Sequence, residues 1–197
     1  MICRVTLPAT LVAGLVFGAV PALAAATTHE SKAELSAFEH GKITLGQAIA
    51  SAEKLSGGKV TDASFERMNG KSGYAVTVFA NNKMEEYWVD PVSGQASPVT
   101  RISTREANIQ SLDKVQWPAI QNAKTTLPQA VTMAEQHSGG KAMDVGIEKR
   151  GSAVAYNVEV LKDGKLSTYW VDPTSGQITT QAQHAALVRK PMTAIGG

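Results

Sequence analysis

The stretch YAVTVFANNKMEEYWVDPVSGQ (residues 74–95) occurs a second time as YNVEVLKDGKLSTYWVDPTSGQ (residues 156–177). Both stretches belong to a longer internal repeat, in which residues 43–96 align with residues 125–178 at a constant offset of 82 and without a gap. About 24 of the 54 aligned positions are identical. A period near 80 is too long for a solenoid repeat and fits a tandem pair of small folding units. The sequence therefore predicts two similar units, and we expect each unit to have its own core.

The quoted stretch predicts antiparallel strands in each unit. Tyr74, Val76 and Val78 alternate with other residues, which indicates a strand with one buried face over residues 73–80. The next two residues are Asn-Asn in the first unit and Asp-Gly in the second, and Asp-Gly is a strong signal for a tight hairpin turn. Residues 84–90 are therefore predicted to form the return strand.

A second turn follows each return strand. Aspartate can bond its own backbone, proline fixes its φ angle and glycine closes the turn. The predicted turn residues are Asp90, Pro91, Gly94, Asp172, Pro173 and Gly176.

Each unit is predicted to open with a helix. The pair Thr44 and Gln47 has the spacing of a capping box, and Thr126 and Gln129 repeat it. One apolar stripe follows at helical spacing, which predicts a helix face that packs on the sheet. In the first unit the stripe comprises Leu45, Ala48, Ile49, Ala52 and Leu55. Paired glycines then end each helix. The predicted helix-capping residues are Thr44, Gly57, Gly58, Thr126, Gly139 and Gly140.

Further strands are predicted over residues 60–68 and 95–103, and short lead-in helices over residues 32–42 and 113–124. A helix followed by an antiparallel meander is an α+β arrangement. The predicted fold is therefore two tandem repeats, each an α-helix packed on a three- to four-stranded antiparallel sheet. The predicted divisions are a signal peptide (1–24), an N-terminal lead-in segment (25–42), a first domain (43–103), a linker with a lead-in helix (104–124), a second domain (125–181) and a C-terminal tail (182–197).

The N-terminal residues 1–26 read MICRVTLPATLVAGLVFGAVPALAAA. One basic residue, an apolar run and a small-residue A-x-A site are typical of a secretory signal peptide. We predict cleavage after Ala24, with Ala26 as the alternative site; an uncleaved membrane anchor is the competing interpretation. The single cysteine, Cys3, lies inside this segment, so the predicted mature chain has none and suits an oxidising compartment. The predicted location is periplasmic or secreted.

The composition and motifs favour a binding protein over an enzyme. A formal net charge of +2 gives no electrostatic basis for binding nucleic acid. The motifs of zinc peptidases, serine hydrolases and nucleotide-binding loops do not occur. The four histidines, His29, His40, His137 and His184, are scattered, and His137 is interpreted as a surface or cap residue. We expect no catalytic residue, no metal and no cofactor.

The acidic pair Glu85-Glu86 is the remaining candidate for acid–base chemistry. Its counterpart in the second unit is Ser167-Thr168. Because the pair is not repeated, we interpret it as solvated charge at a sheet edge.

Two tryptophans are the candidate partner-binding residues. If Tyr87 and Val89 face the helix, the alternation of a strand places Trp88 on the open face of the sheet. The same reasoning applies to the second unit, and tryptophan is a common anchor in interfaces. The alternatives are packing between the two units or a strand phase that is wrong by one residue. The candidate residues are Trp88, Trp170, Phe79 and Leu161. Addition of a partner strand at a sheet edge is a second plausible mode of binding, although the sequence does not select the edge.

The T-L-x-Q-A helix, the Gly-Gly turn, the Y-x-V-x-V strand and Y-W-V-D-P-x-S-G-Q together resemble the PepSY domain, present twice. The resemblance implies a non-catalytic module of the kind that accompanies secreted peptidases and restrains them, with a shape similar to that of the beta-lactamase inhibitory protein. It implies a protein partner, and the expected function is binding and inhibition of an envelope or extracellular peptidase. The alternative is an accessory or sensory subunit of a membrane signalling or redox complex. The sequence does not define the oligomeric state, and membrane attachment would arise only through an uncleaved signal.

Overall fold

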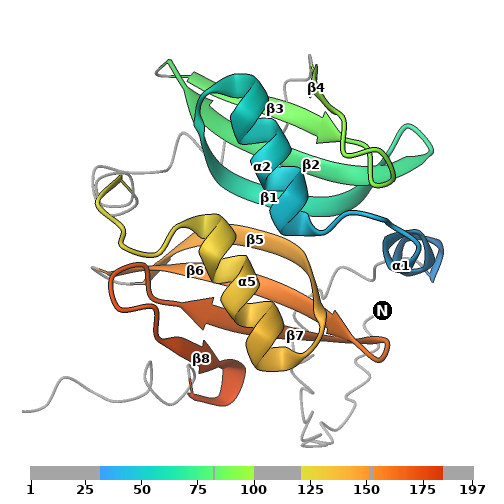
Figure 1. Ribbon diagram of the computed structural model, residues 1–197. Helices are drawn as coiled ribbons and strands as arrows, with labels where there is room; N and C mark the ends of the chain where they lie inside the picture. Colours follow the sequence, from blue (N-terminus) through green and yellow to red (C-terminus); the bar gives the residue numbers. More distant parts are fainter. Residues whose placement is uncertain (1–31, 82, 100–120, 151–152, 184–197) are drawn as a thin grey trace, which may run out of the picture.

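The computed structural model describes residues 32–81, 83–99, 121–150 and 153–183 (Figure 1). These ranges contain helices and antiparallel strands, as predicted for an α+β fold. The elements are α1 (Lys32–Glu39), α2 (Leu45–Ser56), β1 (Lys59–Met68), β2 (Lys71–Ala80), β3 (Lys83–Val89), β4 (Ala96–Val99), α5 (Leu127–Ser138), β5 (Lys141–Arg150), β6 (Ala153–Lys162), β7 (Lys165–Val171) and β8 (Ile178–Thr180).

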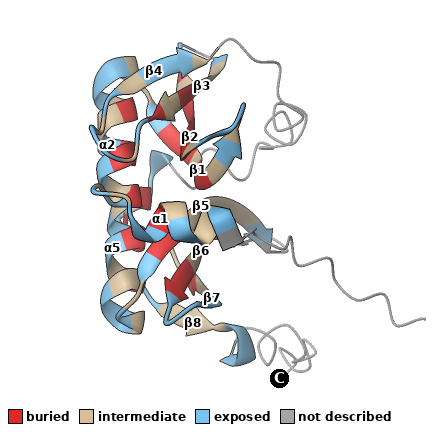
Figure 2. Ribbon diagram, turned by 90° about the vertical axis from the view of Figure 1, so that its right-hand side faces the viewer, coloured by how far each residue is buried: buried red, intermediate tan, exposed pale blue. Residues whose placement is uncertain are grey.

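The two repeats share a single sheet. The strand order is β4-β3-β2-β1-β5-β6-β7-β8, so the first strands of the two units lie side by side at its centre. Every neighbouring pair is antiparallel. Helices α2 and α5 lie next to each other on one face (Figures 1 and 2). We refer to the opposite face as the open face.

The expectation of a separate core in each unit is wrong. The buried apolar side chains of both repeats form one hydrophobic cluster, which lies between the sheet and the two helices. Ala63 on β1 and Val145 on β5 are both fully buried in it. The two cores merge because the central strands pair and the two helices contact each other above that pair.

The helix ends follow the local chemistry of the sequence. The Gln47 N–H donates to Thr44 Oγ1 at 3.2 Å, and the Thr44 N–H donates to Gln47 Oε1 at 2.9 Å. Thr126 and Gln129 make the same box in the second repeat. Two backbone donors at the start of each helix, which would otherwise lack partners, are therefore satisfied.

The two glycines after α2 have different roles. Gly57 adopts a φ of 68°, the left-handed conformation that glycine enters without strain. Gly58 has no positive φ, but a Cβ placed on it would lie 2.5 Å from the Phe79 carbonyl oxygen. The first glycine therefore turns the chain, and the second lets it pass close to β2.

The predicted apolar stripe of α2 is correct except at its last member. Leu45, Ala48, Ile49 and Ala52 are fully buried, whereas Leu55 is 54% exposed. At about 100° per residue, Leu55 lies roughly 70° from the centre of the stripe and Ser56 only about 30°. Ser56 instead faces inward, where its hydroxyl donates to the Ala52 carbonyl at 2.8 Å.

Helix α1 confirms the first of the two predicted lead-in helices. Phe38 is 3% exposed, and its ring packs edge-on against Phe65 with a centroid distance of 5.2 Å. The second lead-in helix was predicted over residues 113–124, most of which lie outside the described residues. The predicted strand over residues 95–103 corresponds to β4, and its last residues also lie outside them.

Candidate binding face of the sheet

The strand register assigns the side chains of the first repeat to the two faces. Tyr87 and Val89 belong to the hydrophobic cluster under α2. Trp88 lies between them in the sequence and pairs across the ladder with Ala75, while Phe79 pairs with Met84. Because directly paired residues share a face and neighbours alternate, Trp88 and Phe79 both belong to the open face. Both are half-buried.

Trp88 lies flat on the neighbouring strand. A Cβ on Gly73 would lie 2.6 Å from Trp88 Cζ2, so the indole occupies the space that a side chain at position 73 would need. The second repeat has Ala155 at the position of Gly73. Gly73 therefore lets the Trp88 ring lie closer to the sheet than Ala155 would let the Trp170 ring lie.

The second repeat holds its tryptophan differently. Trp170 pairs with Asn157 across the ladder, and its indole N–H donates to Glu148 Oε2. The Asn157 amide donates to the same oxygen at 3.3 Å. Trp170 is 7% exposed and Leu161 is 6% exposed. Leu161 packs against the hydrophobic cluster, but it alternates with the fully buried Val160, so the strand pattern assigns it to the open face. Each repeat thus places its tryptophan and its other candidate residue at different ladder positions of neighbouring strands, and those of the first repeat are the more accessible.

The open face also carries carboxylates, of which only Glu86 was a candidate from the sequence. The pairings of Asp62 with Thr77, Ser64 with Asp144, and Glu66 with Gly73 place these acids opposite α2 and α5. The repeat could have pointed to these acids, because Asp62 and Glu66 recur as Asp144 and Glu148 at the offset of 82. The carboxylates of this face are Asp62, Glu66, Glu86, Asp144, Glu148 and Glu159. Among the described residues, no group of three His, Cys, Asp or Glu side chains has a metal-site arrangement.

The interpretation of Glu85-Glu86 as solvated edge charge is wrong. Both residues are half-buried, because β3 lies between β2 and β4. Glu85 accepts a hydrogen bond from the Tyr87 hydroxyl at 2.7 Å. This bond, together with burial and the nearby charge of Glu85, raises the pKa of Tyr87.

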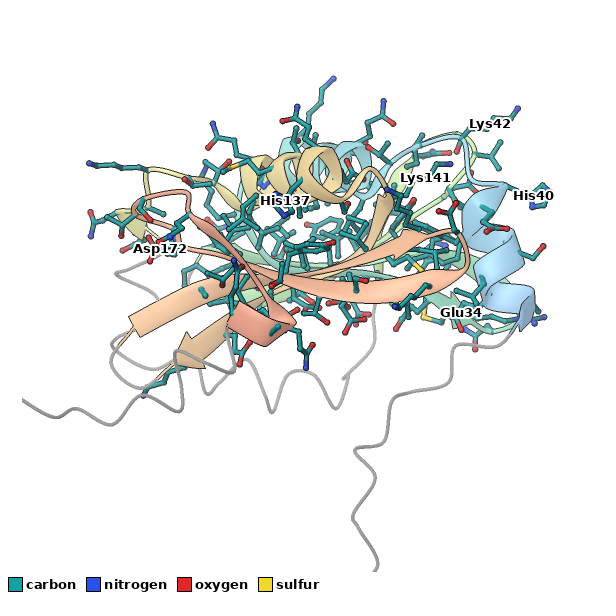
Figure 3. All side chains as sticks on the ribbon, turned by 90° about the horizontal axis from the view of Figure 1, so that it is seen from below. Glu34, His40, Lys42, His137, Lys141 and Asp172 are labelled. Atoms are coloured by element: carbon teal, nitrogen blue, oxygen red, sulfur yellow. The ribbon has the colours of Figure 1, made fainter. Side chains whose placement is uncertain are left out.

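Of the described histidines, His40 directly follows α1 and His137 lies on α5 (Figure 3). His137 is exposed on α5, and its ring contacts Tyr169 edge-on with a centroid distance of 5.5 Å. The Nδ1 atom of His40 lies 2.6 Å from the Ser36 carbonyl oxygen. His29 and His184 lie outside the described residues.

The residues shared by the two repeats tie each helix start to the sheet. The Pro91 carbonyl accepts from the Ile43 N–H at 3.2 Å, and the Tyr74 hydroxyl donates to the Ile43 carbonyl at 2.9 Å. Pro173 and Tyr156 make the equivalent bonds to Thr125. The repeated Tyr and Asp-Pro positions therefore have a structural explanation.

The outer strands of the sheet are β4 and β8, and the same repeat position lacks an available donor on both. Pro98 on β4 has no N–H. Thr180, which is 82 residues later, donates its N–H to Gln183 Oε1 at 3.0 Å, and its hydroxyl lies 3.2 Å from the same oxygen. Addition of a partner strand would need free donors at these edges. The edges therefore suit partner binding less well than the open face.

Together, the fold and the open face define a duplicated α+β protein whose two helix-on-sheet units share one sheet. The sequence profile of PepSY, the peptidase propeptide and YPEB domain, matches residues 42–96 and 124–182. The matched residues are more than half of the chain, so the chain belongs to the PepSY family. PepSY domains are generally non-catalytic. None of the described helices has both the length and the apolar character needed to cross a membrane.

A crystal structure of a candidate lipoprotein from Clostridium difficile 630 is similar, with 19% identity and a TM-score of 0.36. The similarity covers 71% of this chain and 92% of that one. No curated protein matches the chain significantly.

Proposed function

We propose that this chain is a non-catalytic periplasmic or secreted protein that binds a peptidase of the cell envelope or the extracellular medium and inhibits it. The observation that carries the proposal is the presence of two PepSY domains, a family whose description refers to peptidase propeptides. The predicted signal peptide over residues 1–24 supports the location.

The open face is the proposed contact surface, with Trp88 as its central residue. Phe79 lies on the neighbouring strand and shares that face. A half-buried tryptophan offers a large contact area and loses little conformational entropy on binding, because glycine and the sheet already restrict its ring. Trp170 and Leu161 are the proposed contacts of the second repeat; their low exposure makes them the smaller contribution.

The experiment begins with crosslinking of the mature protein in its native envelope, followed by identification of what it captures. Any peptidase found is then purified, and its activity is measured as the mature protein is added. We expect saturable inhibition, and we expect Trp88→Ala to weaken it by about tenfold or more. Leu55→Ala is the matched control, because Leu55 is an exposed residue of α2, and α2 covers the other face of the sheet.

Peptidase activity that stays constant at saturating protein would refute the inhibitory role. Inhibition that is equally strong in Trp88→Ala and the wild type would refute the proposed contact surface. Capture of a membrane signalling or redox complex without a peptidase would favour the accessory-subunit alternative.

A further inference from the structure

The contact between the two repeats is short and pseudo-symmetric. Residues 62–64 of β1 pair antiparallel with residues 144–146 of β5, and α2 contacts α5 above that ladder. We call this contact the seam. Ala63 and Val145 are fully buried at its centre, in the hydrophobic cluster that both repeats share. A repeat without a partner would expose this apolar surface to water, so each repeat needs another repeat at its seam.

Each repeat shapes its half of the seam with its own residues. Within the first repeat, the Val60 N–H donates to Glu53 Oε1 at 3.2 Å. Within the second repeat, the Ala142 N–H donates to Glu135 Oε1 at 2.9 Å. These bonds lie next to the paired residues of each strand and do not involve the other repeat. A repeat therefore offers the same short stretch of strand to a partner repeat, whether that partner belongs to its own chain or to a second copy.

The seam distinguishes a first repeat from a second one. Ala63 lies directly opposite Val145, so a small side chain faces a larger one. Pairing of two first repeats would place alanine opposite alanine and leave a void in the core. Pairing of two second repeats would place valine opposite valine and crowd the same position. Both changes of volume destabilise a close-packed core, so the complementary partner of a first repeat is a second repeat.

The segment between the repeats does not determine which copy supplies the partner. Residues 100–120 connect Val99, at the end of β4, to Gln121, which lines one cavity with Lys59 and Val60 of β1. Strand β4 lies three strands from β1, which is about 14 Å across the sheet. A segment with this number of residues can reach up to about 70 Å. The second repeat of the same chain and that of a neighbouring copy are therefore both within reach.

We propose that two copies of this chain exchange repeats, so that the first repeat of each copy forms its seam with the second repeat of the other. Both seams of this dimer have the contacts of the single chain, so the balance between the two forms depends on protein concentration and on the length of the connecting segment. In dilute solution the attached repeat has the higher effective concentration, and the single chain is favoured. The exchanged dimer carries two complete open faces and can bind a partner bivalently.

The inference goes beyond the proposed inhibition and does not need a peptidase. Its test uses two full mature chains, Ser64→Cys and Asp144→Cys, since the predicted mature chain has no cysteine of its own. The two positions pair directly across the seam. Directly paired residues have Cα atoms about 4.5–5.5 Å apart, which a disulfide can join. Each chain has one cysteine, so a disulfide between positions 64 and 144 requires a seam between two copies.

The two variants are unfolded and refolded as a mixture at rising concentration and then oxidised. A covalent dimer should appear on a non-reducing gel, and its fraction should rise with concentration. The control mixture is Leu55→Cys with Asp144→Cys, because Leu55 is exposed on α2 and takes no part in the ladder. It should give less covalent dimer at every concentration. Equal amounts of covalent dimer in the two mixtures, or none in either, would overturn the proposal.

A shortened chain tests the role of the connecting segment. Deletion of residues 101–119 leaves two residues between Val99 and Gln121, which can then be at most about 11 Å apart. This reach is less than the distance across three strands, so the seam cannot close within one chain. Sedimentation velocity should show a shift from the wild-type sedimentation coefficient to that of a dimer. A shortened chain that is folded by circular dichroism and remains a monomer would overturn the proposal. If the shortened chain does not fold, the cysteine experiment, in which the connecting segment is intact, decides the question.

Discussion

Ala63 on β1 pairs directly with Val145 on β5, and the two residues occupy the same position in the two repeats. The neighbouring pairs obey the same rule, because the offset of 82 exchanges the pair Asp62–Gly146 with the pair Ser64–Asp144. A pseudo-two-fold axis therefore passes through the Ala63–Val145 pair. The duplicated chain keeps within one molecule the kind of self-complementary contact that joins two copies in a symmetric dimer.

The helices limit how far this central ladder extends. It contains only three pairs, and both strands have a bulge beside it, after Val60 and after Ala142. The Val60 N–H donates to Glu53 Oε1 at 3.2 Å, and the Ala142 N–H donates to Glu135 Oε1 at 2.9 Å. These two donors are occupied by glutamates of the helices, so they are not available to continue the ladder between β1 and β5.

The shared core predicts that the two repeats unfold together. Val158 is fully buried in the second repeat, and Val158→Ala should lower the free energy of unfolding by about 1–2 kcal/mol through lost burial and a cavity. Hydrogen exchange should then accelerate equally in β2 and in β6, because opening either repeat exposes the common cluster. Faster exchange confined to β6 would show that the units unfold independently.

Two buried tyrosines predict a loss of stability in alkaline solution. Burial raises the pKa of Tyr156 to about 12, and burial together with the charge of Glu135 also raises the pKa of Tyr74. An unfolded tyrosine titrates near pH 10. Above about pH 10 the unfolded state therefore releases protons that the folded state keeps, so stability should fall as pH rises.

The measurement is a pair of denaturant titrations at neutral pH and above pH 10, with Tyr156→Phe as the comparison. At neutral pH the variant should lose about 1 kcal/mol with the hydrogen bond to Thr125, and its alkaline loss of stability should be smaller than that of the wild type. An equal alkaline loss in both proteins would contradict the assignment to Tyr156.

The sequence could predict each unit but not how the units join. Alternation at Tyr74, Val76 and Val78 and the Thr44–Gln47 box are local signals, and local backbone chemistry produced the strand and helix they indicated. The pairing of Ala63 with Val145 depends on two segments 82 residues apart, and neither side chain carries a directional signal for it. The prediction that Leu55 is buried failed for a related reason. An apolar residue at the margin of a helix stripe can lie on either side of the boundary between the buried and the exposed surface of the helix.

The candidate site was predictable only as a choice of face. Alternation next to Tyr87 and Val89 placed Trp88 opposite the helix, and the register agrees. How far each indole is covered depends on nearby residues of other strands: Gly73 leaves room for the Trp88 ring, whereas Glu148 accepts a hydrogen bond from the Trp170 indole. The carboxylates were not identified as a group because they lie far apart in the sequence and share a face only through the pairing of neighbouring strands.

The Asp-Pro-x-Ser-Gly turns predict a loss of stability in acid. Asp90 Oδ1 accepts from the Ser93 N–H at 2.7 Å, the Ser93 hydroxyl at 2.9 Å and the Val92 N–H at 3.0 Å. These bonds, the Ser93 backbone bond foremost, lower the pKa of Asp90. Burial alone would raise the pKa of Asp172, but the equivalent bonds from Ser175 and Thr174 outweigh it and lower it. The stabilisation is therefore present above about pH 4 and lost as pH falls through the lowered values.

Asp90→Asn and Asp172→Asn isolate this effect, because asparagine keeps the acceptor oxygen and cannot titrate in acid. Each variant should lose less than about 1 kcal/mol at neutral pH, since Asp90 is exposed and Asp172 is only half-buried. The double variant should show a smaller fall in melting temperature between pH 6 and pH 3 than the wild type does. A fall of the same size would mean that other carboxylates govern the acid sensitivity.

One donor position on each outer strand is blocked, and opening these positions should increase self-association. Pro98→Thr places an N–H on β4 at the position where Thr180 has one on β8, and Gln183→Ala removes the side chain that occupies the Thr180 donor. Each single variant should form dimers at high concentration through one edge, because an unpaired strand edge is a template for another strand. The double variant has two open edges and should form longer assemblies, since further copies can add at both sides of the sheet without forming a closed ring.

Sedimentation velocity at rising concentration measures dimer formation and longer assembly. Ser97→Thr on β4 is the control, because it adds no donor. A double variant that keeps the wild-type sedimentation coefficient throughout would show that Pro98 and Gln183 do not protect the edges.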